Sequence, residues 1–277
     1  MVIKTILKIV TLQLTLIIIC QCKKEVEPRV TIPDGNFLKA LIEQGVDING
    51  NGIISFSEAE VITFLDVSED SISDMTGIEA FINLDTLVCY DNQLTTLNVS
   101  NNTALKSLNC AYDRLITLDI SNNTYLTNLN CYLNGLTTLD VSNNPLLEVL
   151  DCCFNKLTTL DFSNNPRLTY LNCGCFTNHI ATLDFSNNPL LETLICQAIQ
   201  LTNLDVTNNT LLVNLECGGN QLTILDVSKN TALINFGIGN MPLLTKVCVW
   251  QIPFPPTGIV VNTTGSPNVY FTTDCSK

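Results

Sequence analysis

A repeat of 21 residues runs through most of this sequence and limits its fold more than any other feature. The first full unit reads LDTLVCYDNQLTTLNVSNNTA and begins at Leu84. Later units begin at Leu105, Leu126, Leu147, Leu168, Leu191 and Leu212. The fifth unit has two extra residues near Cys175–Asn178, a variant unit covers about 61–83, and a degraded unit begins at Leu233. Self-similarity at this period is typical of solenoids, in which each unit packs only on its neighbours.

The consensus LxxLxCxxNxLxxLDVSxNxx places apolar residues at six recurring positions of the unit. Alternation around LxC and LDV predicts two short parallel strands per coil. The nineteenth position of the consensus holds asparagine in all seven full units. A buried asparagine there can hydrogen-bond the backbone where the coil turns. These asparagines are Asn102, Asn123, Asn144, Asn165, Asn188, Asn209 and Asn230.

This consensus resembles the leucine-rich repeat over about 61–247, and more closely its bacterial IRREKO subclass. The resemblance implies an α/β leucine-rich-repeat solenoid that is β-rich and right-handed, with parallel stacked coils and a small helical N-terminal cap. Exported bacterial repeat proteins such as the internalins are similar, which implies protein–protein binding or adhesion. We expect a signal peptide (1–21), a tether (22–32), a helical cap (33–65), the repeats (61–247) and a C-terminal cap (248–277).

The first 22 residues are typical of an export signal. Lys4 and Lys8 precede an apolar run that is too short to span a bilayer as a helix. The run ends in Cys20 and Cys22 and resembles a bacterial lipoprotein signal. We predict lipidation at Cys22, with Cys20 as the alternative residue and a signal without lipidation as the alternative interpretation. The expected location is the outer membrane or cell surface of a Gram-negative bacterium.

Residues 47–58, DINGNGIISFSE, match the twelve-residue EF-hand loop at each ligand position. The predicted ligands are Asp47, Asn49, Asn51, the carbonyl of Ile53, Ser55 through water, and Glu58. Helices are expected at about 34–45 and 56–64. Two charged ligands and the lack of a paired loop predict weak, structural Ca²⁺ binding, on the order of 0.1–1 mM. The alternative is a relic turn that no longer binds metal.

Thirteen cysteines divide into groups by their spacing. Seven recur with the repeat and predict one inward column of free thiols, because a linear column does not converge on a metal. They are Cys89, Cys110, Cys131, Cys152, Cys173, Cys196 and Cys217. Cys248 and Cys275 bracket a Pro-rich tail and are predicted to form a disulfide. Cys153 and Cys175 are expected on outward positions of adjacent coils, and whether they pair stays open.

Aromatic residues near the LxC strand form the candidate ligand-binding surface, since exposed aromatic rings suit both protein partners and sugars. They are Tyr90, Tyr112, Tyr132, Phe154 and Tyr170. The leading prediction is a monomeric recognition or adhesion protein that binds a protein partner. The alternatives are a glycan-binding surface protein and a structural envelope protein without a discrete ligand.

Charge and histidine content argue against two further classes of function. The net charge is −13, whereas a nucleic-acid-binding protein needs a basic surface to contact phosphates. His179 is the only histidine, so Ser-His-Asp and Cys-His catalysis are disfavoured. We therefore predict that the protein is not an enzyme. A third repeated column, of aspartates from Asp119 to Asp226, is interpreted as structural, with a calcium ladder as the alternative.

Overall fold

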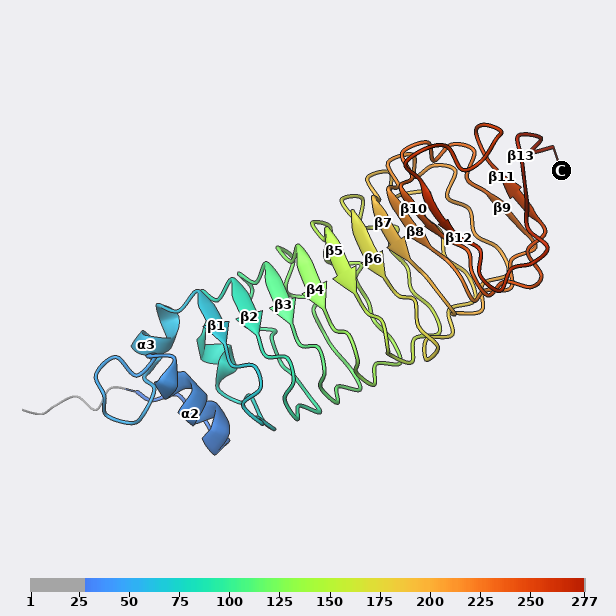
Figure 1. Ribbon diagram of the computed structural model, residues 1–277. Coiled ribbons are helices and arrows are strands. Elements are labelled where there is room, and N and C mark those ends of the chain that lie inside the picture. Colours follow the sequence, from blue (N-terminus) through green and yellow to red (C-terminus); the bar gives the residue numbers. More distant parts are fainter. Residues whose placement is uncertain (1–27, 277) are drawn as a thin grey trace, which may run out of the picture.

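The computed structural model describes residues 28–276 and forms a parallel β-solenoid of about ten turns with little helix (Figure 1). Ten short strands form one parallel sheet along the solenoid, in the order β1-β2-β3-β4-β5-β6-β7-β8-β10-β12. Their bounds are β1 Phe64–Asp66, β2 Thr86–Val88, β3 Ser107–Asn109, β4 Asn128–Asn130, β5 Val149–Asp151, β6 Tyr170–Asn172, β7 Thr193–Ile195, β8 Asn214–Glu216, β10 Asn235–Gly237 and β12 Val260–Asn262. The predicted signal peptide and Cys22 lie outside the described residues. No helix within residues 28–276 is long and apolar enough to cross a membrane.

The N-terminal cap contains two helices, α2 (Gly35–Glu43) and α3 (Phe56–Glu60), which are shorter than the predicted ones. Asp34 begins α2, because its side chain accepts hydrogen bonds from the backbone N–H groups of Asn36 and Phe37. Its other carboxylate oxygen accepts from the backbone N–H of Ser73 at 2.9 Å. The helix cap is therefore tied to the first coil, just before the 3₁₀ turn η1 (Ile78–Ala80).

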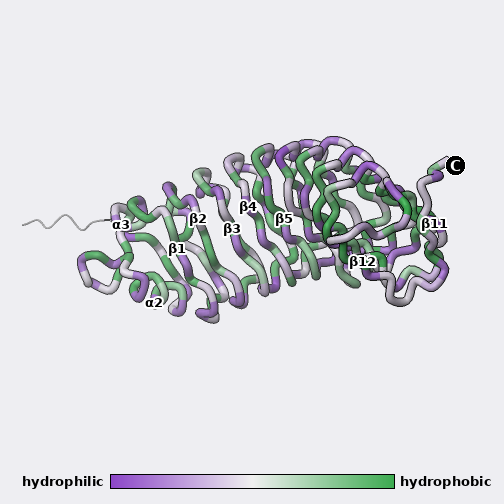
Figure 2. The backbone as a smooth tube through the Cα atoms, turned by 45° about the horizontal axis from the view of Figure 1, so that its top comes forward, coloured by the Kyte–Doolittle hydropathy of each residue, from purple (hydrophilic) through white to green (hydrophobic). Residues whose placement is uncertain are grey.

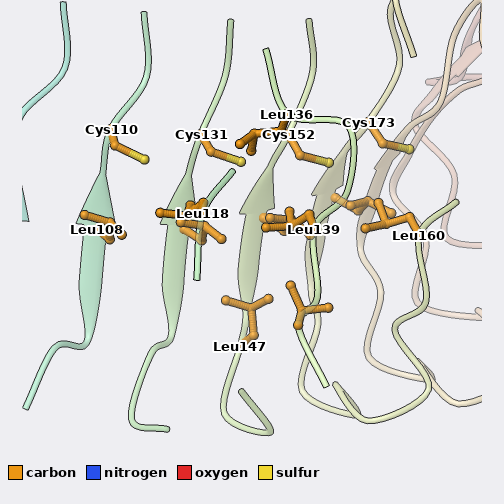
Figure 3. Packing of buried hydrophobic residues seen from close by; sticks show 14 of the residues in the cluster. Leu108, Cys110, Leu118, Cys131, Leu136, Leu139, Leu147, Cys152, Leu160 and Cys173 are labelled. Atoms are coloured by element: carbon orange, nitrogen blue, oxygen red, sulfur yellow. The ribbon is translucent and has the colours of Figure 1, made fainter. Parts of the chain in front are cut away.

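The repeat register is confirmed, because equivalent residues of successive units pair across the sheet. Leu87 pairs with Leu108, and Leu108 pairs with Leu129. Each strand from β1 to β9 buries its middle residue and turns the two flanking residues outward. The buried leucines and cysteines form rows along the solenoid (Figure 3). Hydrophobic and hydrophilic segments consequently alternate along the coils (Figure 2).

The predicted asparagine column is completely buried at the turn of each coil. Asn123 illustrates its role, because its amide nitrogen donates to the carbonyls of Val99 and Asn102, both in the preceding coil. The carboxamides of Asn102, Asn144, Asn165, Asn188, Asn209 and Asn230 make the equivalent pair of bonds. These side chains supply donors to carbonyls that no strand pairs, which stabilises the turns.

A second asparagine column follows the seven repeat cysteines, which we call the ladder cysteines, at a distance of three residues, or five in the unit with the insertion. The amide nitrogen of Asn155 donates to the carbonyls of Cys131 and Cys152, one in the preceding coil and one in its own. Asn92, Asn134, Asn178 and Asn220 donate in the same way. In the coil of Cys110 this position is Asp113, and in the coil of Cys196 it is Ile199, so neither coil supplies an amide nitrogen there.

The predicted second strand of each coil forms a sheet only near the C-terminus. There β9 (Ile224–Asp226), β11 (Lys246–Cys248) and β13 (Tyr270–Thr272) pair in parallel. In earlier coils within the described residues the same segment forms isolated bridges, such as Asn98 with Asp119. Alternating apolar residues specify an extended backbone, but they do not specify hydrogen bonding between coils.

The Pro-rich tail continues both sheets, although its sequence had indicated a departure from the repeat. Strand β12 pairs with β10, and β13 pairs with β11, so the tail adds one more coil. The ring of Phe254 packs against the rings of Trp250 and Phe271, with centroids 5.3 and 4.8 Å apart. This aromatic cluster, together with the last coil, covers the end of the apolar core.

Candidate recognition surface

The outward face of the ten-stranded sheet carries two columns of mostly polar side chains. One column is Thr86, Ser107, Asn128, Val149, Tyr170, Thr193, Asn214, Asn235 and Val260. The other is Val88, Asn109, Asn130, Asp151, Asn172, Ile195, Glu216, Gly237 and Asn262. Asparagine recurs in both columns, so the face offers both hydrogen-bond donors and acceptors to a ligand.

Three of the five predicted aromatic residues lie together beside this face. The ring centroids of Tyr112 and Tyr132 are 5.1 Å apart, and those of Tyr132 and Phe154 are 5.3 Å apart in an edge-on arrangement. We call these three residues the aromatic stripe. Burial, followed by the neighbouring Tyr112, raises the pKa of Tyr132 to about 12, so this phenol is neutral at physiological pH.

Two residues of the aromatic stripe, Tyr112 and Phe154, have a left-handed backbone, as does Leu133 between them. The second residue after each ladder cysteine is left-handed in most coils, with φ of 58° at Tyr112, 51° at Leu133 and 54° at Phe154. Later coils place Ala198, Gly219 and Asn240 at this position. Large side chains are disfavoured there by roughly 1–2 kcal/mol each. Their presence in three successive coils indicates a role beyond backbone geometry.

The other two predicted residues are placed differently. The hydroxyl of Tyr90 donates to the carboxylate of Glu69 at 2.8 Å, in the preceding coil. Tyr170 is the first residue of β6, on the sheet face itself. Sequence reasoning missed Leu133, which is 40% exposed between Tyr112 and Phe154. Its sequence position could have indicated this exposure, because Leu133 occupies the same repeat position as Tyr112 and Phe154.

The face continues past the aromatic stripe into a shallow hollow of about 280 Å³. Four glycines, Gly218, Gly219, Gly237 and Gly239, contribute to its lining, together with Gln197, Glu216, Asn240, Asn262 and Phe176. Close stacking explains these glycines in part, since a Cβ on Gly218 would lie 2.7 Å from the carbonyl oxygen of Gly239. Phe176, on the two-residue insertion, is 80% exposed. The insertion was the sequence feature that could have predicted an exposed Phe176.

The aspartate column on the opposite strand shapes turns. The carboxylate of Asp119 accepts a hydrogen bond from the backbone N–H of Ser121 at 2.9 Å, and Asp140 does the same with Ser142. The bond from Ser121 holds the pKa of Asp119 below its ordinary value. Asp161, Asp184, Asp205 and Asp226 repeat the arrangement. These bonds support the structural interpretation of the column.

The predicted calcium loop is closed by its own hydrogen bonds. One oxygen of Glu58 accepts from the side-chain amide of Asn49 at 2.8 Å, and the other accepts from the hydroxyl of Ser55 at 2.8 Å. The carboxylate of Asp47 accepts from the backbone of Gly52 at 2.8 Å. Burial would raise the pKa of Glu58, but the bonds from Ser55 and Asn49 together lower it. The loop thus gathers an ionised carboxylate and neutral oxygen atoms, a donor set that suits Ca²⁺.

The cysteines occupy two kinds of environment. The seven ladder cysteines are fully buried, as predicted, and the sulfur atoms of Cys110, Cys131, Cys152 and Cys173 point in the same direction (Figure 3). Cys153 and Cys175, expected to face outward, are only 4% exposed. The reason is that their side chains fold over the strand end toward each other's coil. The thiols of Cys248 and Cys275 lie within 4.8 Å of each other, beside Asp226.

The fold is a leucine-rich-repeat solenoid with one buried row of cysteines, and it is similar to the solenoids of internalins. No family model matches the sequence. Internalin J of Listeria monocytogenes (strain F2365) is 38% identical over 71 residues, 26% of this chain. The solved functional domain of InlJ from Listeria monocytogenes, which includes a cysteine ladder, is 34% identical with a TM-score of 0.67 over 86% of this chain.

Internalin C2 from Listeria monocytogenes is similar in fold alone, with 20% identity and a TM-score of 0.66 over 76% of this chain and 97% of that chain. The 71 aligned residues span 8% of the full internalin J sequence, and the structural match covers 61% of its solved functional domain.

Proposed function

We propose that this chain is an exported recognition protein that binds a protein partner through the strand face of its repeats. The observation that carries this function is the aromatic stripe, in which exposed Tyr112 and half-buried Tyr132 and Phe154 pack together beside a polar sheet face. Tyr112 and Phe154 hold this place at a cost in backbone conformation. Aromatic side chains provide large and rigid contact area and dominate many protein interfaces. The likeness to the functional domain of InlJ supports the placement of the binding site on the repeats.

Site-specific photo-cross-linking tests the location of this surface. A photoreactive phenylalanine analogue at position 112 should cross-link a discrete surface protein, because this side chain is 49% exposed. The matched control is position 125, where Tyr125 is 60% exposed in the turn before β4 and outside the stripe. Equal cross-linking from both positions would contradict a binding site at the stripe.

Replacement of the stripe then tests its contribution to affinity. The joint change Tyr112→Ala, Tyr132→Ala and Phe154→Ala should weaken binding of the cross-linked partner at least tenfold, since hot-spot aromatics contribute about 2 kcal/mol or more each. Tyr125→Ala should leave the affinity unchanged. Circular dichroism and thermal unfolding would confirm that both variants are folded. Unchanged affinity of the triple variant would discard the stripe.

Glycan binding is the second candidate, and the hollow beside Phe176 favours it. Its lining combines an exposed aromatic ring with the carboxylate of Glu216 and several amide groups, which suit the apolar face and the hydroxyl groups of a sugar. A glycan array in calcium buffer is the test. Saturable binding to one sugar class that Phe176→Ala abolishes would favour this candidate over a protein partner.

A lipid anchor at Cys22 would hold the protein at the bacterial outer membrane or cell surface. A single acyl chain binds membranes only marginally, so a stable anchor requires a second membrane-binding signal, such as another acyl chain. Mass spectrometry of the mature N-terminus tests the proposal. An unmodified N-terminus beyond Cys22 would exclude the anchor and leave export without lipidation.

Calcium would stabilise the N-terminal cap, with Asp47, Asn49, Asn51, Ile53, Ser55 and Glu58 as ligands. Calorimetric titration of the wild type should give a dissociation constant on the order of 0.1–1 mM. Glu58→Gln removes a charged ligand but keeps a hydrogen-bonding side chain, so the same titration should show little heat. Equal binding by both proteins would refute the site.

A further inference from the structure

A regular backbone hydrogen bond joins successive coils just beyond the strand end. The second residue after a ladder cysteine donates its N–H to the carbonyl of the first residue after the next ladder cysteine. The pairs are Asp91 to Ala111 (2.9 Å), Tyr112 to Tyr132 (2.8 Å), Leu133 to Cys153 (3.0 Å), Ala198 to Gly218 (2.9 Å) and Gly219 to Gly239 (2.8 Å), where Ile238 holds the cysteine position of the last pair. This row extends along both sides of the irregular fifth unit.

Sulfur atoms replace this bond where the fifth unit begins. By the pattern, the N–H of Phe154 should donate to the carbonyl of Gly174. It donates instead to the sulfur of Cys175, and the Gly174 carbonyl accepts from the thiol of Cys153 at 3.2 Å. The two-residue insertion follows directly, so the two thiols bridge the coils at the place where the regular bond is lost.

The two sulfur atoms also interact with each other. A hydrogen bond between the thiols raises the pKa of Cys153 and lowers the pKa of Cys175. The Cys175 sulfur accepts further from Phe154 and, at 3.9 Å, from the side chain of Asn178. Donors aimed at one sulfur stabilise its thiolate form, which is the nucleophile in thiol–disulfide exchange.

We propose that Cys153 and Cys175 are oxidised to a disulfide that joins the fourth and fifth full coils. In the reaction, the Cys175 thiolate attacks a disulfide such as oxidised glutathione and releases one thiol. Cys153 then loses its proton and attacks the mixed disulfide at Cys175, and a second thiol leaves. Two protein thiols are thus oxidised while one external disulfide is reduced to two thiols. In the cell this modification rests on the proposed export, which would supply the oxidising compartment.

The ladder cysteines are unsuited to the same reaction. Their side chains are parallel, as Figure 3 shows for four of them, and Cys131 donates its thiol to the carbonyl of Asp151 at 3.5 Å. Burial raises the pKa of Cys110 to about 12 and raises that of Cys152 well above its ordinary value. Protonated thiols are poor nucleophiles, so oxidation should be confined to the pairs outside the ladder.

Thiol counting on the full chain tests the proposal. Reduced, denatured protein is refolded in a glutathione redox buffer, because both sulfur atoms are buried in the folded protein. Free thiols are then alkylated under denaturing conditions and counted by mass spectrometry. The wild type and the double variant Cys153→Ser, Cys175→Ser should have the same number of free thiols. The variant would have two fewer if both residues were free in the wild type, and that result would overturn the proposal.

Two controls make the result specific. Cys196→Ala with Cys217→Ala removes two ladder thiols and should lower the count by two. Peptide mapping of the refolded wild type must show Cys153 linked to Cys175, and a link through Cys152 or Cys173 would overturn the assignment. Peptide mapping of protein recovered from the bacterial envelope distinguishes the proposed disulfide from the proposed export. A disulfide formed in glutathione but absent from that protein would contradict export and leave the chemistry of the pair intact.

Discussion

At the scale of single residues, Asp113 departs from a column of asparagines and should make stability depend on pH. One oxygen of Asp113 accepts from the backbone N–H of Leu94 at 2.9 Å, as the asparagine oxygens do. The other oxygen takes the place of the donor nitrogen, is buried and has no hydrogen-bond partner among the described residues. Equivalent positions face two carbonyls. Only a protonated carboxyl can donate there.

The substitution Asp113→Asn tests this, because it restores the side-chain N–H donor that the other members of the column have. Burial raises the pKa of Asp113 to about 7, with Asp91 raising it further and Arg114 opposing. The unfolded value is about 3.9. The protonated carboxyl therefore contributes stability below about pH 4, and this contribution is lost as pH rises through about 7. Asp113→Asn should increase the free energy of unfolding by about 1–3 kcal/mol at pH 8 and by little at pH 4.

Urea denaturation at the two pH values measures the difference. Glu192→Gln, which removes a charge at an exposed position, is the matched control and should show no such pH dependence. The same gain in stability from Asp113→Asn at both pH values would contradict an ionised, unpartnered carboxylate. The repeat alone predicted that this column holds asparagine, but the two-carbonyl environment of each member follows only from the stacked coils.

At the scale of elements, the spacing between adjacent coils leaves no room for a side chain at Gly174. A Cβ at this position would lie 2.2 Å from the backbone nitrogen of Gln197 in the next coil, so the backbone itself must move. Gly174→Ala should destabilise the protein by about 1–3 kcal/mol. Thermal unfolding measures the effect. The control is Gly35→Ala, since nothing lies within 4 Å of a Cβ there. Equal stability of the two variants would contradict close stacking at this junction.

Strand positions could be predicted from the sequence because each has an apolar residue at a constant repeat position. Two features could not be predicted. The burial of Cys153 and Cys175 depends on the insertion, which breaks the repeat at that point. The coil formed by β12 and β13 lacks the consensus, and its membership in the sheets depends on pairing with β10 and β11. The residues of the aromatic stripe were predicted, but the left-handed backbone of Tyr112 and Phe154 was not.

At the scale of the whole molecule, the last coil protects the end of a continuous core. Removal of residues 250–277 should expose Val247 and Phe236, which are now buried. The expected result is a fall in Tm of roughly 5–10 °C, from several kcal/mol of lost burial at about 2–4 °C per kcal/mol, with increased aggregation. Thermal unfolding and light scattering measure both. Removal of residues 273–277 alone, after β13, is the control. If the protein without residues 250–277 had the same Tm as the full-length protein, the last coil would not protect the core.

The direction of the asparagine bonds gives the solenoid an order of assembly. Each buried turn asparagine donates backward, as Asn230 does to the carbonyls of Val206 and Asn209 in the coil before it. A chain that leaves the ribosome or an export channel N-terminus first therefore brings, with every new coil, the donors that the previous coil lacks. Growth of the fold can keep pace with delivery of the chain, and only the most recent coil is incomplete at any moment.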